Sequence, residues 1–292
     1  MASPYYINWG PPISASYRAA PMDRYVVIGN PVSHSLSPEI HARFAASLDE
    51  RIEYGRLLAP TGEFATHAQR FFDEGGHGAN VTLPFKVDAF RFAQSSSARA
   101  RAAGAANFLQ RRDGEIHADN TDGAGLVADL TRNLALELRG SRILVLGAGG
   151  AARGVIGPLL ALAPAALEIA NRTAGRAVEL EQAFAPMGPV RALDWGALDH
   201  ASSALVINAT STSTRGEPLD IPPRLIGPGV FAYDLAYGPA AGAFVESARR
   251  TGAHASDGLG MLVEQAAESY FLWRGRRPQT RAVLAELRAR PA

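Results

Sequence analysis

Residues 142–152 read Arg-Ile-Leu-Val-Leu-Gly-Ala-Gly-Gly-Ala-Ala, and this stretch decides the fold. The apolar run 143–146 is typical of a buried strand, and an apolar helix is expected from the glycines to about Leu162. Between them stands the pattern Gly147-x-Gly149-x-x-Ala152, which permits a tight turn and lets the backbone approach a pyrophosphate at a helix N-terminus. Such a pattern alone is weak, but its place between strand and helix predicts a dinucleotide site, formed by Gly147, Ala148, Gly149, Gly150 and Ala151.

The residues after the next strand indicate which dinucleotide binds. An NAD site places an acid about 20 residues beyond the glycines, to bind the ribose 2′-hydroxyl. Residues 171–176 read Asn-Arg-Thr-Ala-Gly-Arg and contain no acid. Arg172 and Arg176, with Thr173 between them, suit a 2′-phosphate instead. The alternative, two ordinary arginines at a helix start, is electrostatically poor unless an anion binds there. The sequence therefore predicts NADP.

The bulk composition describes an ordinary globular protein with a small-molecule partner. The chain has 292 residues, which suggests about two domains, with 47% hydrophobic and 20% charged residues. A net charge of +1 favours neither nucleic acid nor a membrane as partner. The absence of cysteine excludes disulfides and fits the cytoplasm, and the seven scattered histidines make a metal site improbable.

Short apolar runs alternate with helical patterns along most of the chain, which predicts α/β architecture with parallel sheets. Strands are expected at 25–28, 52–58, 78–82, 108–110, 115–118, 143–146, 167–170, 205–208 and 230–233. Helices are expected at 38–48, 63–74, 122–133, from the glycines to about 162, and at 173–184, 260–274 and 279–288. Residues 1–21 do not read as a signal peptide, and we expect a disordered extension ahead of a possible start at Met22.

Lys86 is the only lysine of the chain, and the other 28 basic residues are arginine. Arginine keeps its proton near neutral pH, whereas lysine can release one in a suitable environment. Pro84 is well placed to open a helix, which would put Lys86 in the first turn, where the helix dipole disfavours a cation. Proton transfer and an ordinary solvated lysine are both compatible with this position.

Further polar residues gather around the same region of the expected sheet. Ser37, before Pro38, would suit a helix N-cap, but Ser35 and Ser37 together would also suit a carboxylate. Asn80 and Thr82 lie two apart on a strand and therefore share a face that could bind a polyol. Asp122 opens a helix, either as a first-turn acid or as a partner that shares a proton with Lys86.

Taken together, these residues resemble the NADP-dependent shikimate dehydrogenase family. The resemblance extends from about 25 to 275 and rests on motifs in the family's order. The motifs are Gly29-Asn30-Pro31 with the following Ser-x-Ser-Pro, Asn80-Val81-Thr82-Leu83-Pro84-Phe85-Lys86, Asn120-Thr121-Asp122-Gly123, the glycine turn, Asn171-Arg172-Thr173, Asn208-Ala209-Thr210-Ser211, Tyr233-Asp234-Leu235 and Asp257-Gly258-Leu259-Gly260-Met261-Leu262-Val263.

The resemblance implies two α/β domains, a discontinuous substrate domain over 22–122 and 263–292 and a Rossmann-like NADP domain over 123–262. It implies that Ser35 and Ser37 hold the substrate carboxylate with Tyr237, and that Lys86 and Asp122 transfer the proton. It assigns the ring oxygens of the substrate to Asn80, Thr82, Asn107, Asp122 and Gln265. It assigns the cofactor to the glycine turn, to Asn171, Arg172, Thr173 and Arg176, and to Leu235, Gly258 and Met261.

The implied activity is the reversible reduction of 3-dehydroshikimate by NADPH in aromatic amino-acid biosynthesis, without a metal, in a cytoplasmic monomer or homodimer. One alternative is a quinate/shikimate dehydrogenase of broader substrate and cofactor use. It would be favoured by an acid after the second strand of the nucleotide domain, and none is present. The other alternative is a non-catalytic NADP(H)-binding regulator, which loss of Lys86 or Asp122 would have favoured, and both are present.

Overall fold

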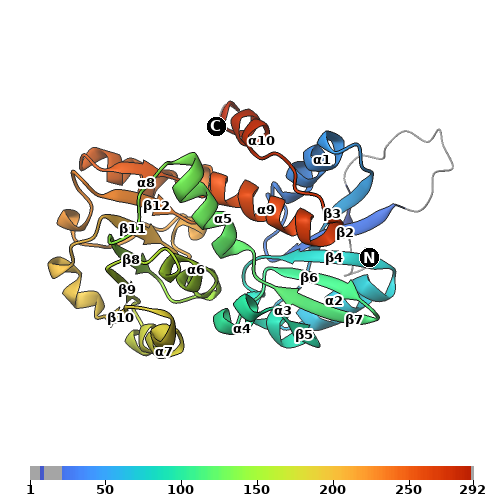
Figure 1. Cartoon of the computed structure of the whole chain (residues 1–292), viewed down its shortest axis with the longest axis horizontal. Coiled ribbons are helices and arrows are strands. Elements are labelled where there is room, and N and C mark those ends of the chain that lie inside the picture. Colours follow the sequence, from blue (N-terminus) through green and yellow to red (C-terminus); the bar gives the residue numbers. More distant parts are fainter. Residues whose placement is uncertain (1–6, 10–21, 291–292) are drawn as a thin grey trace. The chain divides into compact units, whose positions relative to one another are not determined.

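The computed structural model describes residues 7–9 and 22–290 and divides the chain into two compact units (Figure 1). Unit 1 comprises Met1–Thr121 and Gln265–Leu287, and unit 2 comprises Asp122–Glu264 and Arg288–Ala292. The α/β fold class expected from the sequence is confirmed, since both units are built around a sheet with parallel strands.

Unit 1 is built on a seven-stranded mixed sheet in the order β1-β3-β2-β4-β6-β7-β5. Its central strands β2 (Asp23–Gly29), β3 (Ile52–Leu58) and β4 (Gly76–Val81) run parallel. The hairpin of β6 (Phe108–Arg112) and β7 (Glu115–Asp119) adds antiparallel to β4. The helices and the remaining strand of this unit are α1 (Ser37–Ser47), α2 (Phe64–Asp73), α3 (Lys86–Phe92), β5 (Ser95–Ser96), α4 (Ala98–Ala103) and α10 (Arg281–Arg288).

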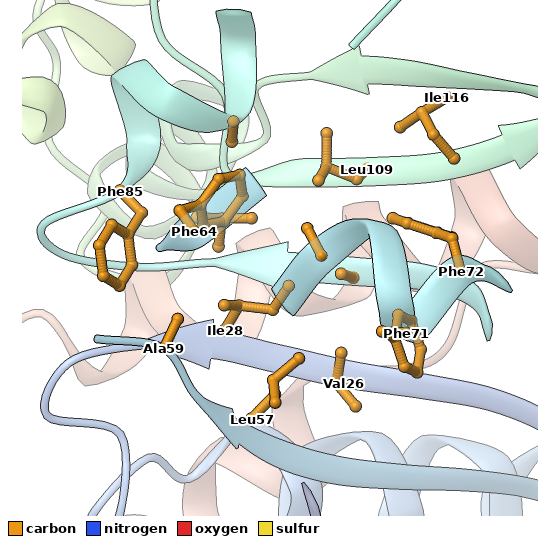
Figure 2. Packing of buried hydrophobic residues seen from close by; sticks show 14 of the residues in the cluster. Val26, Ile28, Leu57, Ala59, Phe64, Phe71, Phe72, Phe85, Leu109 and Ile116 are labelled. Atoms are coloured by element: carbon orange, nitrogen blue, oxygen red, sulfur yellow. The ribbon is translucent and has the colours of Figure 1, made fainter. Parts of the chain in front are cut away.

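Alternate residues of β2 supply two apolar clusters, one on each face of the sheet. Val26 and Ile28 face the cluster that contains Phe71 and Phe72 of α2 (Figure 2). Tyr25 belongs to the opposite cluster. Because successive side chains of a strand point to opposite faces, a strand buried on both faces reads as a continuous apolar run rather than an alternating one. This explains why the run at 25–28 already predicted the strand.

The segment expected as a disordered extension contains a short strand, β1 (Ile7–Asn8), which pairs antiparallel with β3 at the edge of the sheet. Gly55 makes room for it, because a Cβ at that position would lie 2.8 Å from Ile7 and 2.9 Å from the Trp9 ring. The Arg24 guanidinium lies 4.7 Å above the Trp9 ring. The rest of the expected extension lies outside the described residues.

Unit 2 contains a six-stranded, all-parallel sheet in the order β10-β9-β8-β11-β12-β13. In sequence order this arrangement is 3-2-1-4-5-6, the order of the Rossmann fold. The strands are β8 (Arg142–Leu146), β9 (Ala166–Ala170), β10 (Val190–Leu193), β11 (Leu205–Asn208), β12 (Phe231–Asp234) and β13 (His254–Ser256). The principal helices are α5 (Asp122–Ala128), α6 (Gly150–Leu160), α7 (Ala174–Phe184), α8 (Pro239–Arg250) and the first residues of α9 (Leu259–Arg274).

The helix expected over 122–133 changes character at Asp129, where a π-helix (Asp129–Asn133) follows α5. The Asp129 carboxylate is fully buried and accepts hydrogen bonds from the Tyr233 hydroxyl at 2.7 Å and the Asn133 amide at 2.9 Å. Gly260 packs so closely against this carboxylate that a Cβ there would collide with it. The wider helical turn therefore accommodates a buried acid that hydrophobic periodicity does not reveal.

Candidate active site

The glycine turn joins β8 to α6 as predicted, and its glycines serve two different needs. Gly147 has a φ of 108°, and a Cβ there would lie 2.9 Å from the Ala209 carbonyl group. Gly149 is the N-cap of α6 in extended conformation, and a Cβ there would meet no described atom within 4 Å. Gly147 is thus required by the fold itself, whereas Gly149 leaves open space at a helix N-terminus, where a pyrophosphate fits.

The two arginines expected to bind a 2′-phosphate lie at the start of α7. Arg172 and Arg176 are both exposed, and the first turn of the helix carries no acid. The amide of Asn171 donates to the Thr173 carbonyl oxygen at 2.9 Å, and the Arg176 backbone N–H donates to the same oxygen at 3.0 Å. This turn therefore presents two solvent-accessible guanidinium groups beyond the carboxyl end of β9, where dinucleotide phosphates and ribose bind in such sheets.

A buried acid shapes the backbone beyond β12. The Asp234 carboxylate accepts hydrogen bonds from the Ser213 hydroxyl at 2.6 Å, the Asn208 amide at 2.9 Å and the Ala236 N–H at 2.8 Å. Burial raises the pKa of Asp234, and these donors oppose the shift.

Three of the expected cofactor residues, Leu235, Gly258 and Met261, belong to this same region of unit 2. A Cβ at Gly258 would lie 2.5 Å from the Leu235 carbonyl oxygen, so these two residues are in close contact. Met261 is buried in the first turn of α9.

In unit 1, Ser35 and Ser37 form a hydroxyl pair at the start of α1. Ser37 is the first helical residue rather than the cap, and Leu36 at the N-cap position makes no side-chain capping bond. The Ser35 Oγ donates to the Ser37 Oγ at 3.2 Å and accepts from the Ser37 N–H at 3.3 Å. Arg56 donates to the Ser35 carbonyl oxygen from Nη2 at 2.6 Å and from Nε at 3.2 Å. The N-cap alternative for Ser37 is therefore wrong, and Arg56 fixes the loop that carries the pair.

Asn80 and Thr82 lie at the carboxyl end of β4, but the two side chains differ. The Asn80 Oδ1 accepts from the Tyr54 hydroxyl at 2.7 Å, and its Nδ2 donates to the Asn107 carbonyl oxygen at 3.2 Å and to the Ser269 Oγ at 2.9 Å. Thr82 is half-buried just beyond the strand. The Asn80 amide therefore makes three hydrogen bonds within unit 1, and its expected role as a substrate ligand stays a prediction.

Lys86 is the first residue of α3 and is half-buried, which agrees with the first-turn position expected from Pro84. Its backbone carbonyl oxygen accepts from the Ala106 N–H at 2.7 Å. This bond ties the start of α3 to the segment immediately before Asn107.

Asn107 and Gln265, which are far apart in the sequence, meet inside unit 1 at Thr121. The Asn107 Nδ2 donates to the Gln265 Oε1 at 3.1 Å and to the Thr121 Oγ1 at 2.9 Å. The Thr121 N–H donates to the Asn107 Oδ1 at 2.7 Å. All three residues are at least nine-tenths buried. The structure thus brings together two of the expected substrate residues, joined by a threonine to which the sequence had assigned no role.

Asp122 and Tyr237 belong to unit 2. Asp122 is buried at the first position of α5, and Tyr237 is half-buried in the loop between β12 and α8.

Sequence reasoning missed Tyr54, Arg56, Thr121 and Ser269, which hold the expected substrate-binding residues in place. Of these, only Thr121 stood in a quoted motif, and a strand tyrosine or a helix serine carries no local signal of such a contact.

No helix within the described ranges is long and apolar enough to cross a membrane. No group of three or more His, Asp or Glu side chains in residues 7–9 and 22–290 could hold a metal ion.

The all-parallel sheet in Rossmann order, the glycine turn and the basic start of α7 define a dinucleotide-binding protein, joined to a second α/β unit that carries a polar cluster. Models of three domains match the chain: the shikimate dehydrogenase substrate binding domain over residues 27–109, shikimate / quinate 5-dehydrogenase over 129–215, and the shikimate 5′-dehydrogenase C-terminal domain over 258–288. The chain belongs to the shikimate dehydrogenase family.

The chain is also similar to individual curated proteins and solved structures. A curated shikimate dehydrogenase (NADP(+)) from Janthinobacterium sp. (strain Marseille) is 52% identical over 91% of this chain and 97% of its own length. The crystal structure of an Ael1 enzyme from Pseudomonas putida is 43% identical with a TM-score of 0.84, over 91% of this chain and 98% of that one. Shikimate 5-dehydrogenase from Thermus thermophilus, in complex with NADP(H) and shikimate, is 30% identical with a TM-score of 0.80, over 91% and 99%.

Proposed function

We propose that this chain reversibly reduces 3-dehydroshikimate to shikimate with NADPH, in the biosynthesis of aromatic amino acids. One observation carries the proposal: Asn107, Thr121 and Gln265 are buried and hydrogen-bonded to one another in unit 1. Residues 27–109 of this unit match the family's substrate-binding domain. Neutral amides and hydroxyls held in one place are the groups that recognise a polyol, because each hydroxyl of the ligand both donates and accepts. The relatives named above support the same activity.

The cofactor fits the groups that unit 2 presents. Gly147, Ala148, Gly149, Gly150 and Ala151 would hold the pyrophosphate at the N-terminus of α6, where Gly149 leaves open space. Arg172 and Arg176, whose guanidinium groups are accessible, would hold the 2′-phosphate, with Asn171 and Thr173 beside them. Gly258 and Met261 would lie beside the nicotinamide, and Leu235 would also bind the cofactor. When bound, NADPH supplies the hydride that reduces the ring ketone.

The substrate would lie against unit 1 through its carboxylate and its ring hydroxyls. Ser35 and Ser37 would bind the carboxylate with Tyr237, because their hydroxyls lie together at the start of α1. Thr82, Asn107, Gln265 and Asp122 would bind the ring oxygens. Asn80 would contribute through the neighbours it holds, since its amide bonds to Tyr54, Ser269 and the Asn107 carbonyl oxygen.

Lys86 would carry the proton. In the reduction, its ammonium gives a proton to the ketone oxygen as hydride reaches the carbon, so the product is a neutral alcohol and the lysine is left neutral. In the oxidation the same nitrogen takes that proton back. Asp122 would orient the reacting hydroxyl and share the proton with Lys86. A guanidinium could supply charge here but could not cycle a proton near neutral pH.

The test is the absorbance of reduced nicotinamide when the purified chain is mixed with shikimate and NADP, beside matched reactions with quinate and with NAD. We expect turnover with shikimate and NADP to exceed the other combinations by at least tenfold. Comparable turnover of quinate, or with NAD, would identify the broader quinate/shikimate dehydrogenase instead. NADP binding without turnover of either substrate would identify the non-catalytic regulator. The proposal also includes a cytoplasmic location and a monomeric or homodimeric state, and gel filtration of the same sample tests the oligomeric state.

A further inference from the structure

A buried serine lies behind the amides expected to bind the substrate ring, within unit 1. Ser269 is on α9, one turn beyond Gln265, and it is fully buried. Its hydroxyl donates to the Gln265 backbone carbonyl oxygen at 3.0 Å, accepts from the Asn80 Nδ2 at 2.9 Å and lies 3.1 Å from the Thr121 Oγ1. One proton and two lone pairs are the whole hydrogen-bonding capacity of a serine hydroxyl, and this arrangement uses all three.

Backbone groups fix the direction of two of the bonds around Ser269, those with Asn80 and with the Gln265 carbonyl oxygen. The Asn107 carbonyl oxygen can only accept, so the Asn80 group that points to it, and also to Ser269, is the amino group. The Gln265 carbonyl oxygen likewise can only accept, so it takes the single Ser269 proton. Ser269 can therefore only accept from Thr121. The single proton of the Thr121 hydroxyl also lies within reach of the Asn107 Oδ1 and the Gln265 Oε1, both at 3.2 Å.

The same logic continues to the two ring-binding amides. The Thr121 backbone N–H can only donate, so the Asn107 atom that faces it at 2.7 Å is the carbonyl oxygen. The opposite end of Asn107 is then its amino group, which donates to the Thr121 Oγ1 and to the Gln265 Oε1. The orientation of both amides thus follows from the network and not from an arbitrary choice between oxygen and nitrogen.

We propose that Ser269 is a positioning residue for substrate recognition: its hydroxyl holds Thr121 and Asn80, and through them sets how Asn107 and Gln265 meet the ring hydroxyls. The proposal rests on the proposed function, because it takes these two amides as substrate ligands. Ser269 itself does not touch the substrate. Its effect is therefore on affinity for the hydroxylated ring and on discrimination between rings, and not on hydride or proton transfer.

The test is steady-state kinetics of Ser269→Ala with shikimate and NADP. We expect the KM for shikimate to rise about tenfold, the effect of one lost buried hydrogen bond, with kcat within about twofold and the KM for NADP unchanged. Selectivity against a shikimate analogue that lacks one non-reacting hydroxyl should fall by a similar factor. A serine that merely stabilised the fold would lower the melting temperature without separating these constants.

The matched control is Ser203→Ala, which removes a buried hydroxyl of unit 2 that has no hydrogen-bond partner among the described residues. It should leave both KM values unchanged. Thr121→Val supplies an independent readout: if Ser269 acts through Thr121, the double variant should be no worse than the poorer single variant. Kinetics of Ser269→Ala that match Ser203→Ala, or fully additive losses in the double variant, would overturn the proposal. If wild-type protein fails to oxidise shikimate, the proposed function fails instead, and the two failures are distinguished.

Discussion

The ring of His41 stacks on the ring of Tyr54, with centroids 4.3 Å apart and planes 9° from parallel. His41 is fully buried on α1, and neither ring nitrogen has a hydrogen-bond partner in the described residues. Burial lowers the pKa of His41 to about 3, and the nearby Asn80 amide offsets only part of that shift. A neutral aromatic ring therefore supports the tyrosine that donates to Asn80.

This burial predicts a loss of stability on mild acidification. The pKa of His41 is about 3 in the folded chain against 6.5 for the ordinary side chain, so below pH 6.5 the unfolded chain binds a proton that the folded chain does not. The contribution of His41 to the free energy of unfolding is complete above pH 6.5. It falls by roughly 1.4 kcal/mol per pH unit as the pH is lowered to about 3. Denaturant unfolding of wild type and His41→Phe at several pH values measures this difference in slope.

The control is His200→Phe, at an exposed histidine of unit 2, which should keep the wild-type dependence on pH. The free energy of unfolding of His41→Phe should depend less on pH than that of the wild type. Over the two pH units below 6.5 it should fall by roughly 2.7 kcal/mol less. Identical slopes for wild type and His41→Phe would show that this imidazole does not stay neutral in the folded chain.

The glycine turn predicts opposite outcomes for two similar substitutions. Gly147→Ala places a Cβ 2.9 Å from the Ala209 carbonyl group at a φ of 108°, so it should destabilise the fold by about 2 kcal/mol or more. Gly149→Ala should leave the free protein as stable as wild type, because the backbone is extended and no described atom lies within 4 Å. It should nevertheless weaken NADP binding at least tenfold if the pyrophosphate lies there.

Thermal unfolding without cofactor and calorimetric titration with NADP separate these two effects. If Gly149→Ala bound NADP like the wild type, the pyrophosphate would lie elsewhere. If Gly147→Ala were fully stable, the close approach to Ala209 would not constrain the turn.

The start of α7 predicts cofactor preference. Replacing Arg172 and Arg176 together by alanine should raise the KM for NADP at least tenfold and change the KM for NAD by less than twofold, because only NADP carries the 2′-phosphate. The matched control is Arg249→Ala with Arg250→Ala, two exposed arginines at the end of α8 in the same unit. That pair should leave both constants unchanged, and equal losses for both cofactors in the α7 variant would contradict the 2′-phosphate assignment.

Much of the fold could be predicted because local signals agree with it. The strand expected at 52–58 is β3 with the same bounds, since isoleucine, tyrosine and leucine favour a strand and Arg51 and Pro60 stand just outside it. The short edge strand β13 (His254–Ser256) and the helix α8, which opens on Gly238-Pro239, were not predicted, because a three-residue strand and a Gly-rich helix start carry little periodicity. The strand at Ile7–Asn8 depends on Gly55, which lies far away in the sequence.

The residues of the candidate site were likewise predictable where local sequence signals exist and not where only tertiary contacts define them. Residues that stand in motifs, such as Lys86 and Gly149, were named from the sequence because their neighbours gave the local structure. Ser269 and Tyr54 were not, because their contacts with Asn80 join residues 189 and 26 positions apart. Contacts of that kind arise from tertiary packing, which no local pattern records.

The central claim is that the Lys86 nitrogen carries the proton of the reaction, and kcat of Lys86→Arg with shikimate and NADP tests it most directly. The arginine keeps the positive charge but cannot cycle a proton, so we expect kcat to fall at least a hundredfold, about 2.7 kcal/mol of transition-state stabilisation, with both KM values within about threefold of wild type. A Lys86→Arg variant that turns over at the wild-type rate would contradict the account.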